Sequence, residues 1–225
     1  MEPIQFIRAL QFTDSFFPVG AFAYSDGLET AVAGRKVYDA ETLRRWMEHF
    51  LDSVFVPCEG LALVKGMLAL KAGDVEALRR IDMELTAIRP AAAVRASSSG
   101  VGKRLLSLYE TLQGSTQPPC GRPTLPHGNA AAACAMVFFH SGLDERFAAL
   151  AFGYNRLSGM ISAGLRLLPM GQQQGQWLLT QTLQLLPDAV DRIFRMRDEP
   201  LRSFSPLLDI YQMNHQFVYS RLFRS

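Results

Sequence analysis

The sequence predicts an all-α protein that folds as one compact domain of about nine or ten helices. Apolar residues recur at intervals of three and four along most of the chain, which is the period of an amphipathic helix. We find no run of alternating apolar and polar residues bounded by turn formers, the pattern typical of a strand. A length of 225 residues suits one hydrophobic core without metal or disulfide support. We therefore expect a single helical domain over residues 1–225.

The first expected helices follow a bend near residue 20. Ser25 or Asp26 can cap a helix that begins near Gly27. The clearest helix follows Asp39, which is a natural cap, and Pro57 is expected to stop or kink it. The apolar positions of this helix keep the i, i+3, i+4, i+7 spacing: Leu43, Trp46, Met47, Phe50, Leu51, Val54 and Phe55.

Three helices are expected in the middle of the chain. One covers about residues 61–71 and ends at Gly73, and Asp74 can cap the next. A longer helix is expected between Pro90 and Leu112. Small side chains narrow the first half of this long helix, so that another backbone can approach it closely. These small residues are Ser97, Ser98, Gly100 and Gly102.

The second half begins with residues 113–128, whose four prolines and three glycines predict an exposed loop. An apolar helix over residues 130–140 follows, and Asp144 can start a long helix that Pro169 terminates. Ser205 and Pro206 are a strong cap and a first-turn proline for the last helix. The remaining expected helices cover residues 173–186, 188–196 and 206 to about 215.

The charges are unevenly distributed along the chain although the net charge is only +2. Residues 1–84 carry 13 acidic and 9 basic side chains, whereas residues 85–187 carry 3 acidic and 8 basic ones. Such separation can steer a charged protein partner, and scattered solvated charges are the alternative. Because no dense Lys/Arg run is interleaved with aromatic residues, we do not expect nucleic-acid binding.

Cysteine usage and hydropathy indicate a cytoplasmic protein. The three cysteines cannot all pair, and their spacing is not that of a disulfide framework, which favours a reducing compartment. The longest uncharged apolar run covers residues 130–139, well short of the roughly 20 residues of a membrane span. The N-terminus lacks the pattern of a signal peptide. We expect neither a membrane span nor a targeting segment.

Residues 14–29 are unusually rich in aromatics, turn formers and helix-start residues. Pro18 fixes its backbone φ angle and Gly20 permits a bend, so that Phe16, Phe17 and Phe22 are presented from a shaped loop. Spacing alone favours an aromatic plug that closes the core. The alternative is a recognition edge for a partner.

Several short motifs occur in the order typical of one protein family. Near the N-terminus they are Leu10-Gln11-Phe12, Asp14-Ser15, Phe17-Pro18-Val19-Gly20 and Ser25-Asp26-Gly27-Leu28-Glu29. Further along they are Arg95 with Ser98 and Gly102, Tyr154 to Ser158, Arg166 to Gln172 with Gln176, and His215 with Tyr219 to Ser225. Together they span nearly the whole chain. In these motifs the sequence resembles the UreF-type urease accessory proteins.

The resemblance implies a non-catalytic scaffold in urease maturation. Such proteins are similar in forming a homodimer, binding the accessory protein UreD (also called UreH) and recruiting the GTPase UreG. This chain would then couple GTP hydrolysis to nickel insertion into apo-urease, as a chaperone of metallocentre assembly. Nickel and GTP would be handled by the partners, and we expect no cofactor bound by this chain directly.

The resemblance also assigns residues to partner contacts. It favours a recognition edge over a core plug for Phe17 and Phe22. Arg221 and the opening loop are assigned to the GTPase, and the helical body to UreD/UreH. Residues 217–225 are expected to be an interaction tail, because their composition is typical of interface centres. The partner-binding candidates are Phe17, Pro18, Gly20, Phe22, Ser25, Gly27, Leu28, Glu29, Arg95, Ser98, Gly102, Lys103, His215, Tyr219, Arg221, Leu222 and Phe223.

The sequence gives little support to three other kinds of chemical site. Gly100 to Lys103 is not a phosphate-binding loop, because Ser97 and Arg104 stand where that loop needs glycine and a hydroxyl. No Gly-x-Ser-x-Gly elbow occurs, so we do not expect an enzyme. The histidines lack ligand spacing, which leaves only Cys120 and His127 as weak candidates for a metal site.

Two other functions remain open. Arg221 or Arg224 could act as an arginine finger, which would make the chain a GTPase-activating protein for UreG. Cys120 and His127 could chelate nickel jointly or across a dimer, which would make it a nickel metallochaperone.

Overall fold

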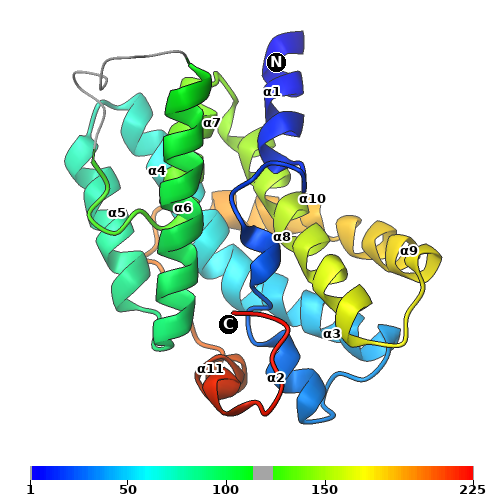
Figure 1. Cartoon of the computed structure of the whole chain (residues 1–225). Helices are drawn as coiled ribbons and strands as arrows, with labels where there is room; N and C mark the ends of the chain where they lie inside the picture. The colour runs from blue at the N-terminus through cyan, green and yellow to red at the C-terminus, as the bar shows by residue number, and fades with distance from the viewer. Residues whose placement is uncertain (1, 114–123, 225) are drawn as a thin grey trace.

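The computed structural model describes residues 2–113 and 124–224, and within these residues it is all helical (Figure 1). Eleven α-helical segments occur in the described residues, with no strand among them, so the expected all-α domain is confirmed. Their bounds are α1 Pro3–Thr13, α2 Leu28–Ala33, α3 Ala40–Phe50, α4 Gly60–Lys71, α5 Val75–Ala87, α6 Ala92–Leu112, α7 Ala130–His140, α8 Glu145–Leu167, α9 Gln172–Leu183, α10 Leu186–Arg195 and α11 Pro206–Asn214. Two short 3₁₀ turns, η1 Ala21–Ala23 and η3 His215–Phe217, complete the two ends.

Helix α1 is not among the helices expected from the sequence. It begins with Pro3 in its first turn, and Glu2 and Gln5 form a reciprocal capping box. Ala9 and Phe12 are buried, whereas Ile4 and Ile7 on the opposite side are more than half exposed. Apolar residues therefore occur all around this helix, so no single face marks its period in the sequence.

Pro57 does not stop the helix that precedes it. Helix α3 continues through the π-helical segment η2, Leu51–Glu59, into α4, so that Ala40–Lys71 is one continuous helix. The wider π turn carries the proline inside the helix, so of the two expected outcomes, a stop or a kink, the stop does not occur. Asp39 caps α3 as expected, accepting from the backbone N–H of Thr42 at 2.8 Å.

The continuous helix Ala40–Lys71 is the one helix in the described residues long and apolar enough to cross a membrane. Of its most apolar 18-residue window, 67% is buried inside the protein, as is typical of a core helix. Helix α4 packs against α7, α5 and α8, and α6 packs on α7. The core therefore forms around α4 and α7, which are the most apolar helices.

A close backbone approach occurs where the narrow face of α6 was expected to allow one. A Cβ atom on Gly102 would lie 2.2 Å from the carbonyl oxygen of Gly128. The hydroxyl of Ser98 accepts from the backbone N–H of Ala130 at 3.1 Å. Helix α7 therefore starts directly against α6, and only a residue without a side chain fits at position 102.

Most of the expected loop 113–128 lies outside the described residues, because residues 114–123 are not described. Its last residues are irregular and held by Asp82, which is fully buried. The Asp82 carboxylate accepts the backbone N–H groups of His127, Gly128 and Asn129 at 2.7, 3.0 and 2.8 Å. One carboxylate thereby fixes the approach to α7.

The C-terminal helices differ from expectation at two places. Pro187 lies in the first turn of α10, so the break between α9 and α10 comes earlier than residue 186. Ser205 does not cap α11 with its side chain; its Oγ is instead hydrogen-bonded to the Nε2 of His49 at 2.7 Å. After α11 the chain turns back, and Figure 1 shows its last residues crossing η1 and the start of α2.

Candidate partner-binding site

Two segments from opposite ends of the sequence form the candidate site. We call residues 14–29 the opening segment and residues 215–224 the tail. The opening segment bends at residues with positive φ: Gly20 at 74°, Asp26 at 51° and Gly27 at 89°. Of these, Asp26 carries a Cβ in a region that usually requires glycine. Asp14 starts the bend, because its Oδ1 accepts from the backbone N–H of Phe16 at 2.7 Å.

The aromatic residues of the opening segment divide between core and surface. Phe17 is half-buried and packs edge-on against Phe12, with ring centroids 5.4 Å apart. Phe22 is 67% exposed and Phe16 is 92% exposed. The segment is therefore a plug at Phe17 and an exposed edge at Phe16 and Phe22.

The tail is held on the opening segment by the buried carboxylate of Glu29. The Nε2 of His215 lies 2.7 Å from the Oε2 of Glu29. The backbone N–H of Leu222 donates to Oε1 at 2.6 Å, and that of Phe223 donates to Oε2 at 3.3 Å. Glu29 and His215 are 4% and 2% exposed. One side chain thus joins both ends of the tail to helix α2.

Arg166 of helix α8 adds a second attachment. Its Nη2 donates to the carbonyl oxygen of Phe22 at 2.7 Å, and its guanidinium carbon lies 4.1 Å from the centroid of the buried Phe223 ring. Partial burial lowers the pKa of Arg166, and the Glu29 carboxylate opposes that shift. A backbone bond from Arg224 to Ala23 at 2.8 Å completes the junction. Arg166 therefore contacts both segments at once.

A cluster of four charges lies beneath the opening segment. The Nη2 of Arg156 donates to Asp26 at 2.6 Å and its Nε donates to Glu59 at 2.9 Å. Arg89 donates to the other oxygen of Glu59 at 2.7 Å. Desolvation alone would lower the pKa of Arg156, but its interaction with Asp26 and Glu59 raises it. These pairs hold the strained Asp26 in place and border a cavity of about 80 Å³.

These ion pairs join acidic residues of the first part of the sequence to basic residues of the second part. Glu59 and Asp26 come from the acidic first block, and Arg89 and Arg156 from the basic second block. Part of the charge separation is therefore neutralised inside the protein and is not displayed to a partner.

The predicted residues of α6 form a separate group. Arg95 is half-buried and donates to the carbonyl oxygens of Arg89 and Pro90 at 2.6 and 2.7 Å, which fixes the connection into α6. Ser98, Gly102 and the alkyl chain of Lys103 lie against residues 128–130. None of these four α6 residues has a hydrogen bond or ion pair to the described part of the tail in the structure.

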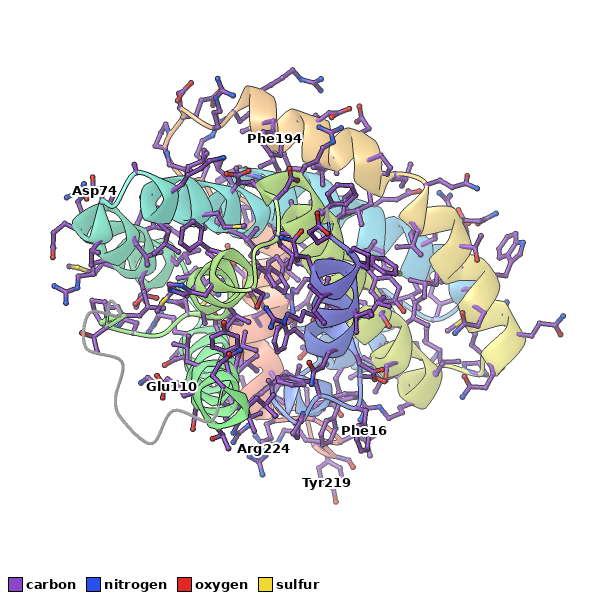
Figure 2. The ribbon with its side chains drawn as sticks, turned by 90° about the horizontal axis from the view of Figure 1, so that it is seen from above. Phe16, Asp74, Glu110, Phe194, Tyr219 and Arg224 are labelled. Atoms are coloured by element: carbon purple, nitrogen blue, oxygen red, sulfur yellow. The ribbon has the colours of Figure 1, made fainter. Side chains whose placement is uncertain are left out.

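The predicted site residues differ in what they expose. Buried are Ser25, Gly27, Leu28, Glu29, Gly102, His215 and Phe223, and half-buried are Phe17, Gly20, Arg95 and Ser98. Exposed are Pro18, Phe22, Lys103, Tyr219, Arg221 and Leu222. Figure 2 shows Phe16, Arg224 and Tyr219 along one edge of the molecule, with Tyr219 pointing outward. The buried members shape this edge, and their role in partner contact stays a prediction.

Arg156, Arg166 and Asp26 organise the site but were not singled out as site residues. Arg156 and Arg166 lie on the largely apolar helix α8. Because charged residues are rarely buried without partners, arginines on such a helix are the signal that could have indicated internal ion pairs. The identity of the partners, 130 and 97 positions away for Arg156, could not be read from spacing.

Residues 2–113 and 124–224 contain no preformed metal site, because no group of three His, Cys, Asp or Glu side chains converges there. His127 is exposed and enters the structure through its backbone, and Cys120 lies outside the described residues. Burial raises the pKa of Cys58 to about 11 and that of Cys134 to about 12. Both thiols are therefore protonated at neutral pH and are poor ligands.

The chain is similar over nearly its whole length to proteins of one family. The sequence model of the UreF family matches residues 37–183. The urease accessory protein UreF of Microcystis aeruginosa is 36% identical over 226 residues, covering 100% of both chains. Those of Trichormus variabilis and Pseudomonas putida are 34% and 32% identical, and each match covers 96% or more of both chains.

Proposed function

Because this chain belongs to the UreF family of urease accessory proteins, we propose that it is a non-catalytic scaffold for loading nickel into apo-urease. It binds UreD/UreH, recruits the GTPase UreG and couples GTP hydrolysis to nickel insertion. Nickel and GTP are carried by the partners. We further propose that it acts in the cytoplasm as a homodimer.

One observation carries the proposal: the Glu29 carboxylate joins the tail to the opening segment. The junction joins two segments about 200 positions apart, on which Phe22, Tyr219, Arg221 and Leu222 are exposed. Exposed aromatic and arginine side chains on an ordered backbone are the residue types that dominate binding energies at interfaces. We assign this surface to UreG.

The same junction supports the coupling step. A tail held by one carboxylate, one arginine and a few backbone bonds can be shifted by a partner that competes for those contacts. Binding of UreD/UreH to the helical body would then change the order of the tail and so the affinity for UreG. This coupling requires that UreG contacts the held tail and the shifted tail with different affinity. The exposed tail residues supply such contacts.

A reconstitution experiment tests the assignment. The chain, UreD/UreH and UreG are purified together, and Arg221→Ala is compared with Arg195→Ala, which removes an exposed arginine from helix α10. We expect Arg221→Ala to lose UreG while retaining UreD/UreH, and Arg195→Ala to retain both. Retention of UreG by Arg221→Ala and by Phe22→Ala would refute the surface assignment.

A second function is favoured by the exposure of Arg221 and Arg224 on the tail. Among the described residues, neither side chain has an acidic partner within 4.0 Å, so either is free to reach a phosphate group in trans. An arginine finger accelerates GTP hydrolysis by roughly 10³ to 10⁵. Single-turnover GTPase assays distinguish the two: intact UreG binding with lost stimulation in Arg221→Ala indicates activation, and lost binding indicates scaffolding.

A further inference from the structure

A groove lies between helix α3 and the start of α11, and its described lining includes no residue of the opening segment or the tail. One wall is a single face of α3, because Thr42, Arg45, Trp46 and His49 follow the i, i+3, i+4, i+7 spacing. The other wall is residues 204–208 with Tyr211. The groove encloses about 530 Å³, which is enough for several side chains of a ligand.

The middle of the groove is aromatic. The rings of Trp46 on one wall and Tyr211 on the other pack against each other with centroids 5.9 Å apart. Phe204 and Leu207 stand on the rim and are 84% and 59% exposed. Large apolar side chains exposed around a hollow mark an interaction site more often than a free surface.

One end of the groove is polar and favours a negative charge. The hydroxyl of Ser205 is hydrogen-bonded to the Nε2 of His49 at 2.7 Å, and the Oγ of Ser53 lies 3.3 Å from its Nδ1. Since Ser205 points to His49, no side chain caps the first turn of α11. An uncapped helix start carries a partial positive charge, which Asp209 in the same turn offsets in part without lining the groove.

The other end is basic. Among the described lining residues the ionisable side chains are Lys36, Arg45, His49 and Tyr211, and none is acidic. Lys36 has no acidic partner within 4.0 Å in the described part of the chain. Arg45 pairs with Glu41 at 3.1 Å, but both side chains are largely exposed, and such a pair is weak enough to be exchanged.

We propose that this groove binds a short, extended, acidic segment of another protein. From Thr42 to His49 the α3 wall is about 10 Å long, which matches about three extended residues. An aromatic or branched aliphatic side chain of the segment packs on Trp46 and Tyr211. Its flanking carboxylates meet Lys36 and Arg45 at one end and the start of α11 at the other. This interaction is additional to the scaffold function and does not depend on it.

Intrinsic fluorescence provides the test, because Trp46 is one of only two tryptophans in the chain. The variant Trp177→Phe leaves Trp46 as the sole tryptophan, since Trp177 lies on α9 outside the groove. The probe is the blocked hexapeptide Glu-Asp-Leu-Phe-Asp-Glu. We expect a saturable change in Trp46 emission, and at least tenfold weaker binding of the Gln-Asn-Leu-Phe-Asn-Gln peptide. Equal binding of the two peptides, or no change in emission at millimolar probe, would overturn the proposal.

Matched variants locate the binding. In the Trp177→Phe background, Arg45→Glu is compared with Arg80→Glu, because both side chains are 68% exposed and each pairs with one acid. We expect Arg45→Glu to weaken binding of the acidic peptide at least tenfold and Arg80→Glu to leave it unchanged. Phe204→Ser tests the apolar part of the interaction, because it removes an exposed side chain from the groove without creating a buried cavity. If Phe204→Ser instead converts a dimer to a monomer in light scattering, a second copy covers the groove and the proposal fails.

Discussion

The Nε2 of His215 lies 2.7 Å from the carboxylate of Glu29, although the two residues are 186 positions apart in the chain. The pair is buried and connects the last turn of the chain to the start of helix α2. The same carboxylate also receives two backbone N–H groups of the tail. The conformation of the C-terminus is therefore decided by a residue near the N-terminus.

Replacement of Glu29 by Ala should destabilise the protein and free the tail. Removing the carboxylate leaves His215 and the N–H groups of Leu222 and Phe223 without this acceptor, and each buried group left unpaired costs about 1–3 kcal/mol. We expect a lower urea midpoint and faster proteolysis after residue 215. A tail that stays protected in Glu29→Ala would show that Arg166 and backbone contacts suffice. Glu29→Gln should lose less, since its amide oxygen still accepts.

The two phenylalanines of the opening segment should respond differently to truncation. Phe22→Ala should weaken UreG binding with a change in unfolding free energy below about 0.5 kcal/mol, because the side chain is 67% exposed. Phe17→Ala should cost about 2 kcal/mol, because it removes the edge-on contact with Phe12. Urea unfolding and UreG pull-down measure the two effects separately. Equal destabilisation by both variants would restore the aromatic plug for the whole segment.

Glycine is required at position 102 but not at position 159. A Cβ at Gly102 would lie 2.2 Å from the carbonyl oxygen of Gly128, so Gly102→Ala should destabilise the protein by about 1–3 kcal/mol. A Cβ at Gly159, inside the exposed face of α8, meets nothing within 4 Å. Gly159→Ala should therefore stabilise by up to about 1 kcal/mol through helix propensity. Thermal unfolding followed by circular dichroism compares the pair.

Stability should fall at alkaline pH through Cys58. Burial raises the pKa of this thiol from 9.0 to about 11, so the folded state favours the neutral form. The unfolded state releases the proton first, and the stabilising contribution, complete below about pH 9, is lost as the pH rises toward about 11. Urea unfolding of the wild type and Cys58→Ala across this range measures the contribution. The difference between the two should shrink with rising pH, and a constant difference would contradict the prediction.

Most of the fold follows from local pattern. The period of α3, the caps at Asp39, Asp74 and Asp144, and the breaks at glycine and proline were sufficient to place most helices near their observed bounds. Helix α1 was missed because apolar residues occur all around it, so no single face is marked. The helix does not stop at Pro57, because a π-helical turn accommodates a proline that an α-helical turn would exclude.

The site was less predictable than the fold. Short motifs drew attention to the opening segment and to the tail as two separate pieces, because each is contiguous in sequence. Their junction depends on Glu29 and Arg166, whose partners lie far away in the chain. The groove between α3 and α11 was missed for the same reason. The sequence predicts Ser205 to be a helix cap. In the structure its hydroxyl is hydrogen-bonded to His49 instead, because the fold brings His49 close to it.

The residue order alone determined the helical class, most of the helix positions and the family, because these depend on periods of three and four and on short contiguous motifs. The tertiary structure decided which side chains are exposed and which charges are paired. Burial and ion pairing depend on distances between residues that are remote in sequence, and a linear pattern carries no record of those distances. Phe17 and Phe22 illustrate this: they are five positions apart with the same side chain, yet only Phe22 is presented to solvent.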